Sequence, residues 1–539
     1  MNAEPSTGLY DPQPRQLVLR DLVRRGRERL DRLPDGALAE LLEDALYEER
    51  HRLERRQAEE GERERLDVLA QALVRGDRQR QLDAAMSLVL AWGDEIHGIF
   101  DPRMYRFATR LLPRALTGLL SQRRRPSMRR WLAGEARDLD LGSRFDVRGN
   151  TALLRDLSRE ATLILAPTHV SNLDSPLIGL ALHLVGLPPF VYGAGLNLFS
   201  NPVMGFFLRR LGAYTVDRTK RARLYKDVLK DYSIRCLVTH HHSLFFPGGT
   251  RARSGHLETT IKKGLLGTGV VAWQEMLAKG SENPDVYIVP ATLTFQLVLE
   301  ANTLIEDHLE REGKHRYIIS DDEFAEPRTV ANFARRVLDL DDSVVVHFGD
   351  PMDCLGNPVS ADAAERHQQS IDRRRYVTDH EGKVEWDPQR DRCYTDRLAD
   401  TLAGAYPRGT AVMATHLSAW VAWTLLEERI GSRDPFRLVR VPALSRHLSR
   451  ERFADRLRWA MGVVDRGVTE GRWDTLLPPT AEEVLDQALH RFGVYHRSHA
   501  LVVRGAELVI EDPRLCLYYR NRLDHRGLFA NEREPEEEE

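Results

Sequence analysis

A histidine and an aspartate five residues apart are the first residues whose types and spacing could do chemistry. The run APTHVSNLDSP places His169 directly after an apolar stretch, and Asp174 follows it in a predicted turn. A histidine can take a proton from a hydroxyl group, and a carboxylate bound to its other ring nitrogen stabilises the imidazolium that forms. We therefore predict a base and its orienting group. The alternative is a polar turn with a capping aspartate.

The position of this pair supports a catalytic reading. The apolar stretch before His169 predicts a strand, and Ser175-Pro176 predicts the start of a helix, with serine as the N-cap and proline at the first helical position. Both side chains are thereby placed at the carboxyl end of a strand, where α/β sheets bind ligands.

A glycine-rich and basic run, FFPGGTRARSG, is the second candidate for chemistry. Backbone N–H groups in such a turn approach an anion closely, arginine makes bidentate bonds to phosphate, and lysine adds a mobile charge. The run and the helix start that follows it predict a phosphate cradle. Its candidate members are Gly248, Gly249, Thr250, Arg251, Arg253 and Lys263. The alternative is a glycine-rich turn with solvated basic residues.

Other chemistries find less support. The chain has no G-x-S-x-G elbow, which weighs against a serine hydrolase. Three consecutive histidines, His240 to His242, cannot converge as a chelating pair at helical spacing would, so we predict a structural or surface role. The four cysteines lie far apart without zinc-ligand or redox spacing, which favours free thiols in a reducing compartment. We predict no metal site at these histidines and cysteines.

The elements that must position these residues alternate in type from about residue 145 to 349. This alternation predicts an α/β fold with a mostly parallel sheet and flanking helices, between helical N-terminal and C-terminal regions. The predicted strands are Thr162–Ala166, Phe190–Tyr192, Ala213–Val216, Ser243–Phe246, Val286–Ala291 and Val344–Phe348. The candidate helices between them include Pro176–Val185, Lys220–Asp231 and Ile261–Leu277.

Changes in residue composition and hydrophobic pattern divide the chain into five parts. We predict a helical N-terminal region (1–144), an α/β domain (145–358), a linker with a hairpin (359–393), a mainly helical C-terminal domain (394–530) and an acidic tail (531–539).

The N-terminal region contains a candidate for contact with a membrane surface. The predicted helix Met104–Leu120 has one apolar and one arginine face, and a basic cluster from Ser121 to Leu132 follows it. The alternative is a helix that packs on the catalytic domain.

Composition restricts the class of protein. The 539 residues include 42% hydrophobic residues, enough for more than one core, and the net charge of -3 argues against a dedicated nucleic-acid binder. The polar N-terminus is not that of a signal peptide. No apolar stretch approaches the roughly 18–20 residues of a transmembrane helix. We therefore predict no nucleic-acid partner and, at most, a peripheral position on a membrane.

Four blocks in order resemble the glycerolipid acyltransferases, most closely bacterial glycerol-3-phosphate and lysophosphatidic acid acyltransferases. They are HVSNLD, GAYTVDR, FPGGTRARSG and YIVPATL, and the resemblance covers about Val147 to Gly349. The long helical regions outside it resemble the glycerol-3-phosphate type. One departure stands out, because the third block usually has glutamate where this chain has Gly248. A carboxylate that could help order the loop is thereby missing.

The resemblance implies a mechanism without an acyl-enzyme, a metal ion or a bound cofactor. His169, held by Asp174, would deprotonate the acceptor hydroxyl, which attacks the thioester of acyl-CoA or acyl-carrier protein. Arg251, with Arg218 and Arg253, would hold the acceptor phosphate, and Pro290 would shape the acyl channel. The implied enzyme is a glycerol-3-phosphate O-acyltransferase of phospholipid synthesis, peripheral on the cytoplasmic face of a membrane. The alternatives are a 1-acylglycerol-3-phosphate acyltransferase and a catalytically silent lipid-binding relative.

Overall fold

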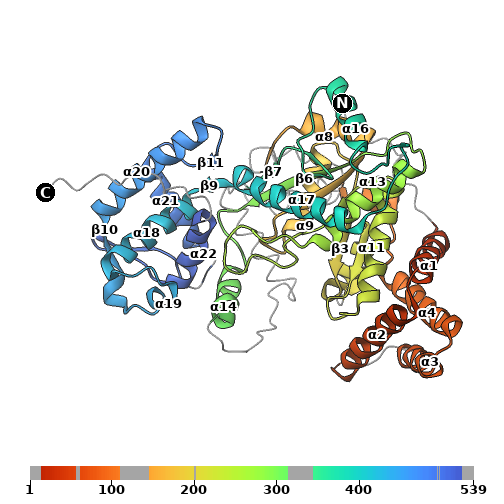
Figure 1. Ribbon diagram of the computed structural model, residues 1–539. Coiled ribbons are helices and arrows are strands. Elements are labelled where there is room, and N and C mark those ends of the chain that lie inside the picture. Colours follow the sequence, from red (N-terminus) through yellow and green to blue (C-terminus); the bar gives the residue numbers. More distant parts are fainter. Residues whose placement is uncertain are drawn as a thin grey trace, which may run out of the picture.

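The computed structural model describes residues 14–55, 61–109, 145–199, 202–312, 344–494, 496 and 498–524. These residues form a central sheet with helices around it, a helical bundle at the N-terminal side and a mainly helical region at the C-terminal side (Figure 1). The predicted fold class, α/β with a mostly parallel sheet between helical regions, is confirmed.

Among the described residues, the central sheet has eight strands in the order β1-β7-β6-β2-β5-β3-β4, with β8 paired to β6. The strands are β1 (Phe145–Arg148), β2 (Thr162–Pro167), β3 (Val191–Gly195), β4 (Ala213–Val216), β5 (Ser243–Leu244), β6 (Val286–Thr294), β7 (Val344–Phe348) and β8 (Met352–Asp353). Strands β2 to β6 run parallel to one another, whereas β7 and β8 pair antiparallel with β6. Strand β1 is parallel to β7.

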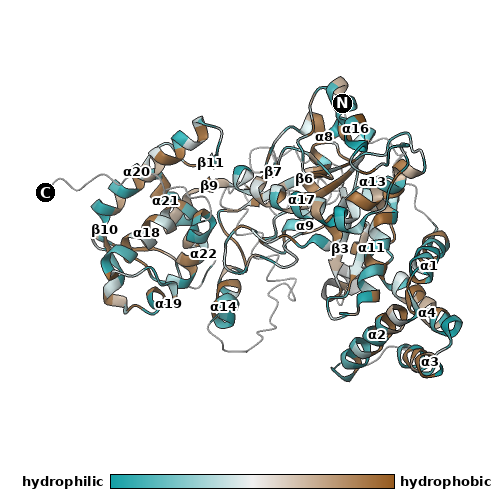
Figure 2. Ribbon diagram, viewed as in Figure 1, coloured by the Kyte–Doolittle hydropathy of each residue, from teal (hydrophilic) through white to brown (hydrophobic). Residues whose placement is uncertain are grey.

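The two middle strands are continuous apolar runs. Every residue of β2 and β6 is buried, as expected for parallel strands that helices cover on both faces. Their register pairs Ile164 with Ile288 and Ala166 with Pro290. Figure 2 shows these central strands in brown, while the outward faces of the surrounding helices are largely teal. The apolar core thus fixes the strand whose carboxyl end carries His169.

In the described part of the sheet domain, seven α-helices connect or flank the strands. They are α8 (Thr151–Glu160), α9 (Asp174–Leu184), α10 (Pro202–Arg210), α11 (Arg223–Val238), α12 (Lys263–Leu266), α13 (Thr268–Ala278) and α14 (Ala301–Glu312). The helix predicted over Ile261–Leu277 is divided at Gly267 into α12 and α13. The helix predicted to begin at Pro176 begins two residues earlier, at Asp174.

The N-terminal helices form a bundle that packs on the sheet domain. Helices α1 (Arg15–Asp31), α2 (Asp35–Arg55) and α4 (Arg78–Ile96) pack against α11, and α3 (Glu62–Arg75) packs against α2 and α4. One apolar cluster joins all four to Tyr214 and Tyr225 of the sheet domain. Arg25 also donates to both oxygens of Glu275 on α13, at 2.6 and 2.8 Å.

The candidate membrane helix is described only in part. Residues 102–109 are helical, and Asp101 accepts hydrogen bonds from the first N–H groups of this helix. The rest of the predicted helix and its basic extension, residues 110–132, lie outside the described residues. Among the helices that the structure describes, none combines the length and apolarity needed to cross a membrane.

The segment predicted as a linker contains helix α16 (Ala363–Arg374) and an antiparallel bridge between Thr378 and Val384. Arg373 is buried and lies 2.6 Å from Asp285 and 3.0 Å from the hydroxyl of Tyr287, so this segment packs on the sheet domain. Helix α17 (Pro388–Gly409) then packs against β6 and leads into the C-terminal region. The domain boundaries themselves stay a prediction.

The C-terminal region is built around the buried helix α18 (Ala414–Ile430), against which α20, α21 and α22 pack. Its elements are β9 (Ala411–Met413), α19 (Pro435–Leu438), η4 (Ala443–Arg446), β10 (His447–Ser449), α20 (Arg450–Thr469), β11 (Asp474–Leu476), α21 (Ala481–Phe492), β12 (Val502–Arg504), β13 (Glu507–Val509) and α22 (Pro513–Asp524). One apolar cluster runs from the sheet into these helices, so the two parts share a core. The predicted acidic tail lies outside the described residues.

Candidate active site

The carboxyl ends of β2, β4 and β5 meet at one edge of the sheet because these strands are parallel members of it. His169 follows β2, Arg218 follows β4, and the turn with Gly248 follows β5. Three blocks that are far apart in sequence therefore come together where α/β sheets bind ligands.

His169 and Asp174 form the hydrogen-bonded pair that their spacing predicts. Asp174 Oδ2 lies 2.9 Å from His169 Nδ1 and accepts the N–H groups of Val170 and Ser171 at 2.6 and 2.9 Å. Asp174 is fully buried at the first turn of α9. Because a carboxylate only accepts, Nδ1 carries the shared proton and the lone pair of Nε2 is left for a substrate.

The imidazole of His169 is held on its face as well as at Nδ1. The ring of Phe246 stacks on it with the centroids 4.2 Å apart and the planes 25° from parallel. The His169 side chain stays 14% exposed, so a substrate hydroxyl has a route to the ring. Phe246 is a contact that spacing did not predict.

The loop that follows the glycine-rich turn makes hydrogen bonds with the backbone of His169. Glu258 Oε1 accepts the N–H of His169 at 2.6 Å, and the N–H of Ala252 donates to the His169 carbonyl at 2.7 Å. Burial raises the pKa of Glu258, while the hydrogen bond from the His169 N–H and the charge of Arg522 oppose this rise. Sequence reasoning missed Glu258, although the absent glutamate at Gly248 was a signal to search nearby.

Glu300 connects the histidine turn to the basic run. This carboxylate is 2% exposed; Oε2 accepts the Ser171 hydroxyl at 2.9 Å. Oε1 accepts the Asn172 N–H at 2.9 Å and Arg251 Nη1 at 3.1 Å. Glu300 was also missed, and the signal for it was a charged residue at the end of the apolar run FQLVLEA.

Three predicted arginines gather beside this network. Arg251 contacts Glu300, and Arg253 Nε lies 2.7 Å from Asp307 on α14. Within the described part of the chain, Arg218 makes no hydrogen bond or ion pair. The pKa of Arg218 is lowered, first by desolvation and second by the positive charge of Arg251. Two guanidinium groups whose charges repel each other favour an anion between them.

The glycine-rich turn is closed by a hydrogen bond from Gly249 to the Phe246 carbonyl, at 3.0 Å. Gly249 has a φ of +75°, and a Cβ there would lie 2.3 Å from Lys262 Nζ. Lys262 therefore faces the turn. The predicted cradle residue Lys263 instead pairs with Asp396 of α17, at 2.8 Å, since it is the first residue of α12 and points the other way.

Pro290 occupies the middle of the sheet. It is buried in β6 beside Ala166, and its carbonyl accepts the N–H of Gly349 at 2.8 Å. Ala166, its partner in β2, precedes His169 by three residues. The role of Pro290 in an acyl channel stays a prediction.

The C-terminal helix α22 covers the far side of the basic loop. Asn521 donates to the Ser254 carbonyl at 2.7 Å, and a Cβ at Gly255 would lie 2.1 Å from the Tyr518 carbonyl oxygen. Arg522 of the same helix is 2% exposed, and neither of its Nη atoms has a hydrogen-bond partner. The C-terminal region thus shapes the site.

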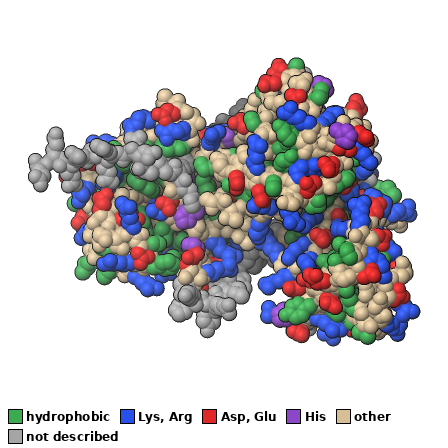
Figure 3. Space-filling model, in the orientation of Figure 1, with side chains coloured by type: hydrophobic (Ala, Val, Ile, Leu, Met, Phe, Trp, Pro, Cys, Tyr) green, Lys and Arg blue, Asp and Glu red, His purple; other side chains and the backbone are tan. Residues whose placement is uncertain are grey.

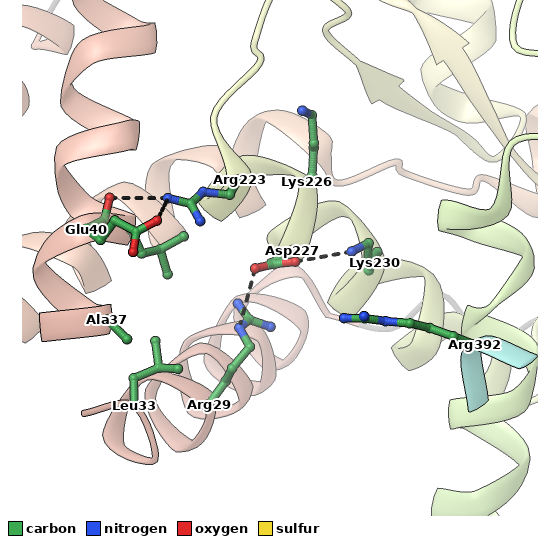
Figure 4. A pocket seen from close by; sticks show the side chains of 10 residues that line it. Arg29, Leu33, Ala37, Glu40, Arg223, Lys226, Asp227, Lys230 and Arg392 are labelled. Carbon is green, nitrogen blue, oxygen red and sulfur yellow. Dashed lines mark hydrogen bonds and ion pairs between the residues drawn. The ribbon is translucent and has the colours of Figure 1, made fainter. Parts of the chain in front are cut away.

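A separate hollow of about 530 Å³ lies between the N-terminal bundle, α11 and α17 (Figure 4). Its basic residues include Arg29, Arg223 and Lys230, which pair with Glu40 and Asp227 as Figure 4 shows. Figure 3 shows Lys and Arg side chains gathered where these helices meet the sheet domain. None of the predicted site residues lines this hollow, so it is distinct from the His169 site.

Known proteins resemble the part of the chain that holds the site. Residues 144–294 match the family model described as Acyltransferase. The chain is 30% identical to a glycerol-3-phosphate acyltransferase of Pseudoalteromonas translucida (strain TAC 125) over 191 residues, which are 35% of this chain and 21% of that protein. Residues 144–294 are thus similar to an acyltransferase domain, and this part of the chain overlaps its similarity to glycerol-3-phosphate acyltransferases.

Two further relatives of the acyltransferase domain have the same name. The protein of Histophilus somni (strain 129Pt) is 31% identical over 160 residues, 29% of this chain and 19% of its own length. That of Pasteurella multocida (strain Pm70) is 32% identical over 146 residues, 27% of this chain and 17% of its own length. The chain thus spans about a fifth of the length of these relatives. Every predicted site residue lies within the matched segment, whereas Glu300 and α22 lie beyond it.

Proposed function

We propose that the protein transfers a fatty acyl group from acyl-CoA or acyl-carrier protein to the hydroxyl group of glycerol-3-phosphate, in phospholipid synthesis. The observation that carries this proposal is the buried Asp174 on His169 Nδ1, with Arg251 linked to the same turn through Glu300. The positive charge of Arg218 lies near that of Arg251. A base next to a cationic cluster suits an acceptor that has both a hydroxyl and a phosphate. The names of the relatives favour glycerol-3-phosphate.

The proposed reaction is a direct transfer. His169 Nε2 takes the proton of the acceptor hydroxyl as its oxygen attacks the thioester carbonyl carbon, and Asp174 stabilises the imidazolium. When the tetrahedral intermediate collapses, the C–S bond breaks and the imidazolium returns its proton to the leaving thiolate. The products are an ester and a free thiol. No acyl-enzyme forms, because the acceptor itself is the nucleophile.

A second acceptor is 1-acylglycerol-3-phosphate. It is favoured by the sequence Gly249-Thr250-Arg251 in the basic run, which is common in the lysophospholipid type. The two acceptors share the phosphate and differ by one acyl chain. The long helical regions outside the acyltransferase domain resemble the glycerol-3-phosphate type. They therefore favour glycerol-3-phosphate, the acceptor without an acyl chain.

The deciding experiment supplies purified full-length protein with one radiolabelled acyl donor, as the CoA or carrier-protein thioester, and compares kcat/KM for the two acceptors. We expect higher kcat/KM for glycerol-3-phosphate. A clear preference for the acylated acceptor would replace this assignment. Absence of transfer to both, by folded protein, would leave the silent lipid-binding relative. His169→Ala serves as the inactive control.

We also propose that the protein acts at a membrane surface. The support is the sequence of the helix from Met104 and its basic extension, together with the exposed Phe107 in the described part. A basic amphipathic helix binds anionic lipid at the interface.

A further inference from the structure

Gly248 and Glu258 occupy one place in the site. A Cβ at Gly248 would lie 2.8 Å from Glu258 Cγ, closer than real Cβ contacts allow. The backbone of Gly248 is outside the left-handed region, so its φ would accept a side chain. What excludes a side chain at position 248 is therefore the stem of Glu258.

The carboxylate of Glu258 uses that space to reach the histidine turn. Its Oε1 accepts the His169 N–H at 2.6 Å, and the loop that carries it also donates Ala252 N–H to the His169 carbonyl. Both polar groups of the His169 backbone are thus held by residues 252–258, while Asp174 holds the ring.

We infer that Glu258 is a positioning residue of the active site, and that its side chain fills the space beside Gly248 so that its carboxylate can hold the His169 backbone. The expected effect of Glu258 on catalysis rests on the proposed function. Arg522 of α22, buried with both Nη atoms unpaired, supplies positive charge near Glu258 and opposes the effect of burial on the carboxylate. The C-terminal helix therefore supports the general base through Glu258.

Four variants separate space from charge. Glu258→Gln keeps the shape and removes the charge, so kcat/KM should fall about tenfold or more, as for loss of a charge-assisted hydrogen bond. Gly248→Ala should also lower kcat/KM, because the added Cβ displaces the Glu258 side chain. The double variant Gly248→Ala with Glu258→Ala relieves the clash without restoring a carboxylate. Its kcat/KM should therefore stay below that of the wild type. Gly248→Glu with Glu258→Ala moves the carboxylate to the other position and should recover most of the loss.

A measurement without turnover distinguishes this inference from the proposed function. The rate at which diethyl pyrocarbonate modifies His169, followed by peptide mass spectrometry against pH, reports when the imidazole loses its proton. The carboxylates about this ring are Asp174 and Glu258, with Glu300 bound to the same turn. The opposing positive charges are Arg251, which is paired with Glu300, and Arg522 near Glu258. Glu258→Gln should move the midpoint to lower pH, because less negative charge stabilises the imidazolium. The exposed Glu282→Gln is the matched control and should not move it.

The outcomes divide cleanly. A wild-type midpoint in Glu258→Gln, or an exchanged double variant no faster than Gly248→Ala with Glu258→Ala, overturns the role of Glu258. If Glu258→Gln fails to fold, as thermal unfolding would reveal, the comparison of the two double variants decides. A shifted midpoint in protein that transfers no acyl group would support the positioning role and contradict the proposed function alone.

Discussion

Replacing Asp174 with asparagine tests the proposed base most directly. The amide has nearly the same shape, and its oxygen can still accept the three donors that Asp174 Oδ2 holds, from His169, Val170 and Ser171. What disappears is the negative charge 2.9 Å from the ring nitrogen. Because the carboxylate is fully buried, water cannot replace that charge.

The size of the effect follows from this geometry. Two unit charges about 3 Å apart interact by roughly 5–6 kcal/mol at an effective dielectric constant of about 20. Only part of a charge develops on the imidazole in the transition state, so about 3–5 kcal/mol is lost, or roughly 10²–10⁴-fold in kcat. The acceptor KM should change little, because Asp174 does not face the phosphate.

The assay measures kcat and KM with labelled glycerol-3-phosphate, together with thermal unfolding of each variant. Asp156→Asn, at an exposed carboxylate on α8, is the matched control and should behave as wild type. In Asp174→Asn the acid limb of the pH–rate profile should move to lower pH. A kcat within about threefold of wild type in folded Asp174→Asn would refute the base–orienter reasoning.

Four further outcomes are expected. His169→Ala should lower kcat by about 10²–10⁴-fold without loss of folding, and near wild-type turnover would contradict the mechanism. Arg251→Ala should raise the acceptor KM by roughly 10–100-fold through loss of a charge-assisted bond of about 1.5–3 kcal/mol, measured by initial rates; an unchanged KM would argue against phosphate binding there. Burial lowers the pKa of His242, which accepts the Leu163 N–H, to about 3. The unfolded chain, with a histidine pKa of about 6.5, therefore binds more protons between these values. Stability should fall as pH drops from about 6.5 towards 3, and urea unfolding of His242→Asn should show a flatter profile. Flotation with anionic vesicles should weaken with salt and with charge reversal of residues 123–125; binding indifferent to both would exclude the electrostatic contribution.

Local sequence determined the base and the turns around it. The bond of Asp174 to His169 spans five residues, so residue types and spacing along one strand–turn–helix unit suffice to predict it. The strands were predictable for a similar reason, because runs such as TLILAP are apolar throughout when both faces of a strand are buried.

The contacts that complete the site are not local. Glu258 reaches His169 across 89 residues and Arg251 reaches Glu300 across 49, and neither pairing leaves a periodic signal in the sequence. Lys262 and Lys263 are adjacent and chemically alike, yet only the direction of the first turn of α12 sends Lys262 to the glycine-rich turn.

The C-terminal region shows the same division most clearly. The region was predicted to be mainly helical, but nothing in the sequence of α22 indicated that Asn521 would bind the Ser254 carbonyl, 267 residues away. Sequence patterns encode which face of an element is buried, since burial of apolar area follows residue type. Which element covers which depends on the shared core that joins the sheet to α18 and α22, and only the packed tertiary structure decides it.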